Sequence, residues 1–503
     1  MKNKINFKKM KSKSDKGFAT IEIVMAFAVL ILCISAVAMV TFGNQTLTID
    51  SETNNEAISK AQALIEKARA DSREDYVSVN TIPSTVEDIY TKFLEITDLT
   101  QCNKQAKSTV SWTTGSRNLS TTLSTFLSDI PGALALGGDC DSGITADYDN
   151  PGGLVSESIG GQGATALDAV NNRLYVTSNK FPPSHNKDFF VYDFSFSPPS
   201  SSSLSLVAEL DLNEGLNDVD VADNYAYVAS DSLTGELQVI DLTTMTQIPG
   251  ATRQLPETNT AKGRRIFFYD NKIYIGTDYL SCPPPCTPTQ NSEFHIYDVS
   301  TPSDPNWEGS VNINHNVNDI FVSGDFAYLA TSDNNHELMV ININPSSPDY
   351  LEHPDDTGFG YNASGNNDGS SIYALGNKIY LGRKQNNNPS SAHDLFVLNK
   401  DSVQDGASTT DGLVISRDLG ISNNSLVTGI VVRSNLAFVG LDNPTIGVLV
   451  LNINTLLPYS SCAGYNFPEN STGIDMSGNF IFTSNRSNDE IQVIYDQPSA
   501  CTP

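Results

Sequence analysis

A repeated unit is the feature that most constrains the fold of this chain. Between residues 154 and 503, an aromatic residue inside a short apolar segment recurs every 44 to 58 residues. These markers are Tyr175, Tyr227, Tyr274, Tyr328, Tyr380, Phe438 and Phe482. Each unit holds three or four short strand-like segments separated by turn residues, without helical periodicity between them. Seven such units predict a seven-bladed β-propeller over 154–503; an array of β-sandwiches would not need seven similar units in one run.

The two ends of the repeat region are predicted to join. The last unit has three strand-like segments between 473 and 495 and then stops, so it lacks a fourth strand. The segment 154–158 precedes the first full unit and is able to supply that strand, which would close the ring and remove exposed sheet edges. The clearest units, 217–241 and 318–342, resemble the LVIVD-type propeller repeat of bacterial surface proteins.

The N-terminal residues predict a helix anchored in a membrane. Residues 18–43 contain no Lys, Arg or Pro and one carboxylate, Glu22. These 26 residues would form about 39 Å of helix at ~1.5 Å per residue, long enough to span a bilayer. Residues 1–17 carry seven Lys and one Asp, so this flank is expected in the cytoplasm. A secretory signal peptide would have a shorter apolar core, and a plain single-span anchor would leave the costly carboxylate unexplained.

The segment 16–22, Lys-Gly-Phe-Ala-Thr-Ile-Glu, resembles the class III signal of type IV pilins and pseudopilins. The resemblance implies that residues 1–17 are a prepilin leader, that prepilin peptidase cuts between Gly17 and Phe18, and that the new amine of Phe18 is methylated. Glu22 would become the fifth residue of the mature chain, where the carboxylate of the family pairs with the N-terminal amine of a neighbouring subunit. Two buried opposite charges offset each other's desolvation, whereas one alone cannot. The pair Ala19-Thr20 departs from the family, in which many members have Thr-Leu.

Residues 44–140 are predicted to complete an α+β pilin-like module, with a long N-terminal helix and a small antiparallel sheet. The helix should continue to about Arg73, because the sequence keeps helical periodicity. Its apolar stripe lies at Ile58, Ala61, Ile65 and Ala68. A strand is expected at 108–112. Residues 141–153 have the composition of a linker. Their acidic side chains suit calcium by charge but lack EF-hand spacing, so a solvated connector is favoured.

Six of the seven cysteines follow the apolar run, and an even number in an exported segment indicates disulfides. Neighbours in sequence suggest the pairs Cys102–Cys140, Cys282–Cys286 and Cys462–Cys501, although six cysteines allow fifteen pairings. Cys33 lies inside the apolar run and is expected to be an inert thiol. Zinc binding is the weaker interpretation, because no His or Cys lies at zinc-site spacing beside these cysteines.

The charge and the motifs favour binding over catalysis. The formal net charge of −28 repels phosphate backbones, so nucleic acid is not an expected partner. No catalytic motif is present and the six His are scattered, so we expect neither an enzyme nor a cofactor or metal. Residues interpreted as turn caps follow the third strands, at Asp193, Asp241, Asp298 and Asn342. Four arginines are expected either to bind an anion in the axial channel or to form ion pairs: Arg264, Arg265, Arg383 and Arg433.

Together these features predict a minor or tip-located type IV pilus subunit whose propeller head mediates adhesion or binds a partner at the cell surface. It would lie in the cytoplasmic membrane with its N-terminus in the cytoplasm, and in an extracellular filament after assembly. The expected partners are other pilin subunits, prepilin peptidase, and a surface protein or glycan. The alternatives are a propeller enzyme of the lyase or glycosidase type displayed on a filament, a pseudopilin of a type II-like secretion system, and a major pilin.

Overall fold

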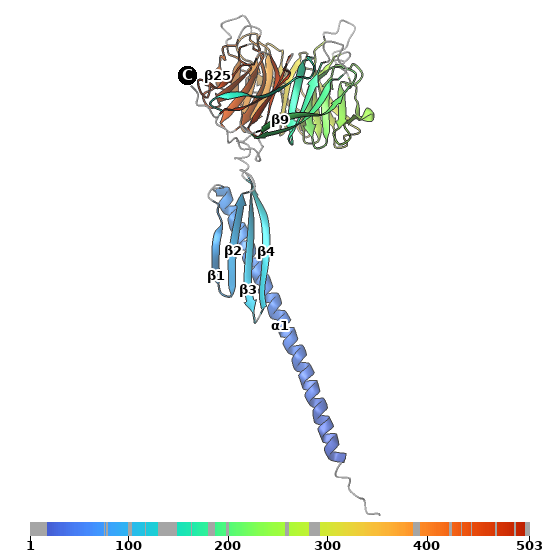
Figure 1. Cartoon of the computed structure of the whole chain (residues 1–503), viewed down its shortest axis with the longest axis vertical. Coiled ribbons are helices and arrows are strands. Elements are labelled where there is room, and N and C mark those ends of the chain that lie inside the picture. Colours follow the sequence, from blue (N-terminus) through green and yellow to red (C-terminus); the bar gives the residue numbers. More distant parts are fainter. Residues whose placement is uncertain are drawn as a thin grey trace, which may run out of the picture. The chain divides into compact units, whose positions relative to one another are not determined.

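The computed structural model divides the chain into two compact units, Met1–Asp129 and Ile130–Pro503 (Figure 1). Among the described residues, one long helix and eight four-stranded antiparallel sheets make the chain mostly β. The residues that the structure describes are 18–74, 76, 79–98, 103–115, 117–128, 148–161, 163–179, 187–197, 201–256, 261–280, 292–385, 393–421, 425–433, 435–443, 445–467, 470–486 and 489–497.

Helix α1 (Phe18–Glu74) runs without a break for 57 residues. Its segment Ile21–Thr41 has a length and composition that suit either a membrane span or a signal anchor, and no other helix in the described part of the chain does. The apolar side chains of this segment are exposed, including Leu32 and Met39. An exposed apolar surface of this length on an isolated helix needs a lipid or protein environment to cover it.

The second half of α1 packs on a sheet of four strands in chain order, which Figure 1 shows beside the helix. The strands are β1 (Ile82–Glu87), β2 (Tyr90–Asp98), β3 (Asn103–Thr114) and β4 (Arg117–Ser128). The helical residues buried against it are Ala57, Ala61, Ile65 and Ala68. Three of the four predicted stripe positions are therefore confirmed, but Ala57 replaces Ile58, which is only half-buried. Alanine at successive turns lets the helix backbone approach the sheet closely.

Seven further sheets form the second unit, and we number them as blades in chain order. Blades 1 to 4 are β6–β9 (Ala164–Val170, Arg173–Ser178, Phe189–Ser197, Ser201–Leu210), β10–β13 (Leu216–Ala222, Tyr225–Ser230, Leu237–Asp241, Thr246–Gln247), β14–β17 (Gly263–Tyr269, Lys272–Thr277, Phe294–Asp298, Asn306–Val311) and β18–β21 (Val317–Ser323, Phe326–Thr331, Leu338–Asn342, Gly360–Tyr361). Blades 5 to 7 are β22–β25 (Gly369–Leu375, Lys378–Arg383, Leu395–Asn399, Leu413–Arg417), β26–β29 (Val427–Arg433, Leu436–Leu441, Val448–Asn452, Gly464–Tyr465), and β30–β32 (Ser471–Ser477, Phe480–Asn485, Ile491–Asp496) with β5 (Pro151–Glu157). Two short helices, η1 (Pro249–Ala251) and α3 (Pro354–Thr357), lie in blades 2 and 4.

The first strands of the seven blades form a closed ring. Each contacts the first strand of the next blade, and β30 of blade 7 contacts β6 of blade 1. This arrangement of four-stranded sheets around an axis is consistent with a β-propeller, as the repeat pattern predicted. Two-residue turns join the first and second strands, with left-handed backbone at Asn171 and Asn172, at Asp223 and at Gly478. Asn, Asp and Gly tolerate this conformation, which matches the twist of a hairpin.

Strand β5 completes the last blade. It pairs with β32, so that Glu157 lies opposite Ile491 and Val155 lies opposite Val493. The predicted contribution of the segment before the first full unit is confirmed, and the strand begins three residues earlier than expected, at Pro151. Tyr148 is fully buried just before it, and its hydroxyl donates a hydrogen bond to the carbonyl of Asn479.

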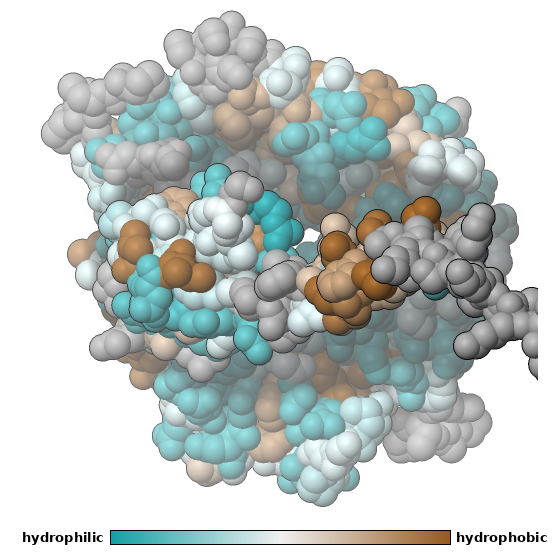
Figure 2. Space-filling model, turned by 90° about the horizontal axis from the view of Figure 1, so that it is seen from below, coloured by the Kyte–Doolittle hydropathy of each residue, from teal (hydrophilic) through white to brown (hydrophobic). Residues whose placement is uncertain are grey.

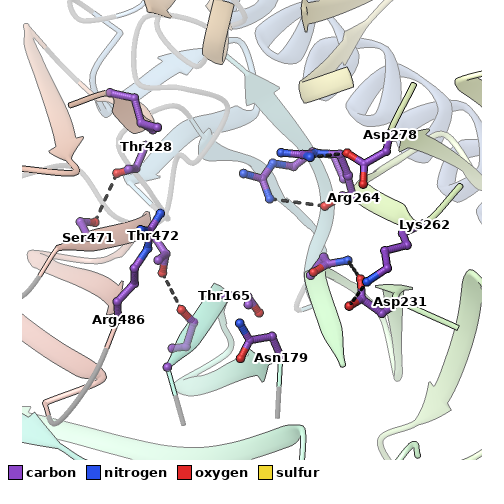
Figure 3. A pocket seen from close by; sticks show the side chains of 15 residues that line it. Thr165, Asn179, Asp231, Lys262, Arg264, Asp278, Thr428, Ser471, Thr472 and Arg486 are labelled. Atoms are coloured by element: carbon purple, nitrogen blue, oxygen red, sulfur yellow. Dashed lines mark hydrogen bonds and ion pairs between the residues drawn. The ribbon is translucent and has the colours of Figure 1, made fainter. Parts of the chain in front are cut away.

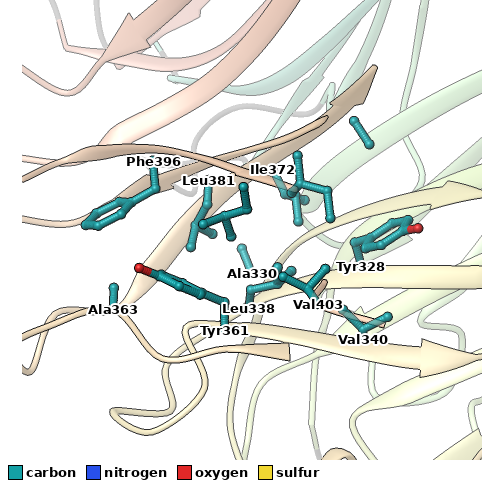
Figure 4. Packing of buried hydrophobic residues seen from close by; sticks show 13 residues of the cluster. Tyr328, Ala330, Leu338, Val340, Tyr361, Ala363, Ile372, Leu381, Phe396 and Val403 are labelled. Atoms are coloured by element: carbon teal, nitrogen blue, oxygen red, sulfur yellow. The ribbon is translucent and has the colours of Figure 1, made fainter. Parts of the chain in front are cut away.

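The repeated aromatic residues lie in the hydrophobic core between neighbouring blades. All seven are at most 5% exposed. Between blades 4 and 5, for example, Tyr328 and Leu338 contribute to one cluster with Ile372, Leu381 and Phe396 (Figure 4). The second strand of every blade is buried on both faces after its first residue, which explains why these segments are continuous apolar runs instead of alternating ones.

Candidate functional site at the mouth of the propeller axis

The predicted processing and assembly residues lie at the start of α1. Gly17 is outside the described residues, Phe18 is the first residue of the helix, and Glu22 is exposed within the apolar segment. Cys33 is a free, exposed thiol, and Cys462 is disulfide-bonded. The remaining predicted disulfide cysteines lie outside the described residues: Cys102, Cys140, Cys282, Cys286 and Cys501. Most of the acidic linker, for which calcium was considered, also lies outside them.

A polar cavity of about 470 Å³ lies where the first strands of several blades begin, at one mouth of the axis. Blades 1, 2, 3, 6 and 7 contribute to its wall (Figure 3). The side chains that line it are Thr165, Asn179, Asn217, Asp231, Lys262, Arg264, Arg265, Asp278, Leu426, Thr428, Ser471, Thr472 and Arg486, together with Gly163 and Ala164. Its volume is within the range of small-molecule sites, but its lining is more polar than is usual for them.

Cations and carboxylates meet on both sides of the mouth. Lys262 Nζ lies 2.7 Å from Asp231 Oδ2, and the other oxygen of Asp231 accepts a 2.8 Å hydrogen bond from the amide of Asn217. Arg264 is ion-paired with Asp278 in the same wall, as Figure 3 shows. On the opposite wall, Arg486 lies 3.4 Å from Asp442, which is just outside the cavity.

Arg265 also lines the cavity and is bonded to the next blade. Its Nε donates a 2.6 Å hydrogen bond to the carbonyl of Asn318 in blade 4. Two carboxylates on neighbouring first strands, Asp218 and Asp319, interact with its charge. Burial raises the pKa of Asp319 to about 7, although Arg265 opposes that shift.

The four arginines singled out from the sequence lie in two different environments. Arg264 and Arg265 line the cavity, as the anion-binding interpretation requires. Arg383 is instead fully buried, with its Nη1 3.2 Å from Glu337 Oε1, and Arg433 donates from Nη2 to the carbonyl of Met476 at 3.0 Å. Lys262 and Arg486 were not predicted as site residues, because the sequence pattern of a strand does not show which of its ends lies at the mouth of the axis.

Carboxylates deeper in the ring connect the blades. Asp168 accepts a 2.7 Å hydrogen bond from the backbone N–H of Val221 in the next blade, and Asp475 accepts one of 2.8 Å from Ala169 across the closing seam. Burial, together with the neighbouring charge of Asp475, raises the pKa of Asp168. The side chains of Asp168 and Asp475 are hydrogen-bonded to each other. Their carboxyl groups are therefore closer together than the roughly 5 Å that separates the two carboxyl groups of a retaining glycosidase.

A second set of carboxylates repeats from blade to blade and was missed in the sequence. An acidic residue directly precedes the third strand in six of seven blades: Asp188, Glu236, Glu293, Glu337, Asp394 and Glu490. All six are at most 2% exposed, and each accepts a hydrogen bond from a backbone N–H beyond the fourth strand. In the sequence, these residues could have been recognised by their position directly before an apolar strand. These carboxylates fix the connection to the next blade, which is a structural role.

The predicted turn caps are confirmed at three of four positions. Asp241, Asp298 and Asn342 accept hydrogen bonds from the backbone N–H two residues ahead, at 2.7 to 2.9 Å. The backbone bond from Thr243 lowers the pKa of Asp241, as expected for a capping carboxylate. Asp193 was predicted wrongly, because its carboxylate binds Arg173 Nε at 2.8 Å across the hairpin.

Three histidines that appear scattered in the sequence are connected through two aspartates at blade 4. Asp333 is 3.6 Å from His315 Nε2 and 3.3 Å from His336 Nδ1, and Asp355 is 3.5 Å from His336 and 3.7 Å from His353. Although burial opposes it, the hydrogen bond from His336 helps to lower the pKa of Asp333. In the described part of the chain, no three His, Cys, Asp or Glu residues are arranged to hold a metal ion.

Exposed hydrophobic side chains on the second unit are dispersed. They lie mainly on outer strands of different blades, as with Leu206 in β9, Trp307 in β17 and Val414 in β25. Figure 2 views the whole chain from below and shows one compact hydrophobic patch in the foreground and smaller ones among hydrophilic residues. Single exposed apolar side chains are ordinary on protein surfaces, so the polar mouth is the better candidate site.

The comparison with family models agrees with the repeat architecture. The family model of the LVIVD repeat matches residues 216–244, 288–313 and 315–353, which fall in blades 2, 3 and 4. The predicted LVIVD-type repeat is confirmed for these residues, which make up less than half of the chain. No curated protein sequence matches the chain. Among solved structures, one titled "Structure of U3-55K" is 7% identical, covers 69% of this chain and 98% of its own, and has a TM-score of 0.47.

Proposed function

We propose that this chain, which carries LVIVD repeats in a ring of four-stranded sheets, is a minor or tip-located type IV pilus subunit. Its head binds a ligand at the cell surface through the mouth of the propeller axis. Before assembly the subunit is held in the cytoplasmic membrane by the apolar half of α1. In the filament, that half packs against other subunits while the propeller remains outside.

The continuity of α1 carries this proposal. One helix of 57 residues joins an exposed apolar segment, long enough to cross a membrane, to a half that is covered by a sheet, so both parts belong to one continuous element. Glu22 supports the filament role. A carboxylate that enters an apolar environment needs an opposite charge, and the amine that cleavage before Phe18 would create on a neighbouring subunit supplies one.

The alternatives differ in where the subunit is found. A pseudopilin would stay within the cell envelope, and a major pilin would line the whole filament. The enzyme alternative gains little from the geometry, because Asp231 and Asp278 at the mouth are both ion-paired. Immunogold labelling with an antibody against residues 154–503 separates the first two. Label at filament ends supports the proposal, and label along the shaft indicates a major pilin.

Replacing Gly17 by valine should block removal of the leader. A peptidase that recognises glycine at this position is expected to exclude a branched side chain there. The Gly17→Val chain is therefore expected to keep its first 17 residues, which intact-mass analysis of the membrane fraction detects. Ser14→Val, in the same leader, should be cut normally. Normal shortening of the Gly17→Val chain would refute the prepilin assignment.

Replacing Glu22 by glutamine should leave insertion and processing intact but reduce filament incorporation at least tenfold. The neutral amide cannot balance the charged amine of a neighbouring subunit. Incorporation is measured by immunoblotting sheared filaments against the membrane pool. Glu52→Gln, at an exposed position further along α1, is the matched control and should assemble like the natural chain. Equal incorporation of both variants would exclude the charge-pairing role.

A further inference from the structure

We propose that the mouth of the propeller axis binds a saccharide that carries a carboxylate group. This inference names the ligand class of the proposed head. It does not depend on leader cleavage or filament assembly, so either proposal is able to fail while the other stands.

The charge of the cavity wall differs in sign from that of the chain. Four cationic side chains line the cavity and only two carboxylates do, which gives the lining a formal charge of 4 − 2 = +2. The whole chain has a formal charge of −28. Asp442 behind Arg486, and Asp218 and Asp319 beside Arg265, offset part of this charge from outside the lining. The groups that a ligand would meet first are nevertheless mostly cationic, which disfavours cationic ligands and allows short-range binding of an anion.

Two guanidinium groups on opposite walls have donors to offer. Arg264 uses Nη1 for Asp278, and Arg486 uses Nη2 for Asp442. A guanidinium group has five N–H donors in a planar fork, so one carboxylate contact does not exhaust it. The side chain of Arg264 is 39% exposed and that of Arg486 is 63% exposed. A ligand carboxylate is a suitable partner, because it accepts two parallel hydrogen bonds from such a fork.

The hydroxyl groups of the wall favour a sugar over a bare anion. Thr165 Oγ1 donates to the carbonyl of Leu216 at 2.7 Å, and Thr472 Oγ1 donates to that of Ala164 at 2.8 Å. Each oxygen also lies 2.9 Å from a second hydroxyl of the protein, Thr177 for Thr165 and Ser484 for Thr472. Since the threonine protons are directed at the carbonyls, the neighbouring hydroxyls use one lone pair of each oxygen, and one lone pair remains as an acceptor for a ligand. Sugar hydroxyl groups donate to such acceptors, whereas sulfate has no proton to donate. The volume of about 470 Å³ is also larger than a simple anion requires.

The test uses the full-length chain in detergent and three acidic monosaccharides: glucuronate, galacturonate and N-acetylneuraminate. Each is compared by calorimetry with its own methyl ester, which keeps the hydroxyl groups and removes the charge. At least one acid should bind at least tenfold more tightly than its ester. Arg264→Gln and Arg486→Gln should each weaken that binding at least tenfold. Arg173→Gln, which breaks an exposed ion pair at the hairpin of blade 1, should leave it unchanged.

Both site arginines are partly exposed, so their variants should retain the unliganded melting temperature of the natural chain within a few degrees, which separates lost binding from lost folding. The proposal is overturned if no acid binds, if an acid and its ester bind equally, or if both arginine variants bind like the natural chain. Binding of inorganic sulfate without binding of any of the acids would also overturn it, since the site would then recognise charge alone.

Discussion

Replacing Arg383 by alanine is expected to lower the free energy of unfolding of the propeller by about 3–5 kcal/mol. Arg383 is completely buried between blades 4 and 5, where its Nη1 lies 3.2 Å from both Glu337 Oε1 and the carbonyl of Ser364. Its guanidinium group also lies over the ring of Phe396, 4.9 Å from the ring centroid. The substitution removes these contacts, leaves a cavity and deprives buried Glu337 of its cation.

Chemical denaturation of the full-length chain in detergent, followed by the transition of the propeller unit, measures this loss. The matched control is Arg173→Ala, which removes the exposed pair with Asp193 and should change stability by less than about 1 kcal/mol. A loss for Arg383→Ala as small as that of the control would show that blades 4 and 5 do not depend on this buried contact.

The propeller is expected to become more stable as the pH falls from 8 to 5.5. Burial raises the pKa of Asp220, Asp319 and Glu293 to about 7. The folded chain therefore holds protons that the unfolded chain has released at these groups, whose ordinary pKa is near 4. Their contribution to stability is full below pH 4 and is lost as the pH rises through about 7. Each retained proton adds a slope of about 1.4 kcal/mol per pH unit.

One buried group acts in the opposite direction. Burial lowers the pKa of His295 to about 4, so the proton that only the unfolded chain takes up below about pH 6.5 reduces stability there. The carboxyl groups whose pKa is raised outnumber this one histidine, so the stability of the propeller should still increase as the pH falls. Melting temperatures of the full-length chain between pH 5.5 and 8 measure it. Asp319→Asn should reduce the pH dependence of stability by the contribution of about one proton, whereas Asp193→Asn, in the exposed ion pair, should not change it. A propeller that loses stability steadily towards pH 5.5 would contradict the assigned pKa values.

The repeat made the sheets and their closure predictable. The marker residues are buried aromatic side chains in the central strands, so one spacing revealed both the number of units and their core. Only three strand-like segments could be counted in the last unit, which predicted that its fourth strand comes from elsewhere in the chain, and β5 supplies it. The stripe on α1 was off by one residue at Ala57, because helical spacing alone does not decide which of two adjacent residues faces a sheet that has yet to be placed.

The site was less predictable, since it depends on contacts between blades. Arg486 and Arg264 lie in blades 7 and 3, more than 200 residues apart in sequence, and only the closed ring brings them to one cavity. The contacts of Asp333 with His315 and His336 were unpredictable for the same reason, because the loops between strands determine where these residues meet. The carboxylates before the third strands were visible in the sequence, but their partners beyond the fourth strand were not.

The pairing of β5 with β32 also sets an order in time. A chain is synthesised from its N-terminus, so β5 emerges before any other propeller strand, and its partner at Ile491–Asp496 emerges after all the others. Until then β5 has no sheet to join, and blade 7 lacks its two outer strands. A chain that is truncated a few residues before Ile491 would have six complete blades and an open seam. Completion of the ring therefore reports that translation has reached the end of the repeat region, and an exposed β5 marks a chain that has not.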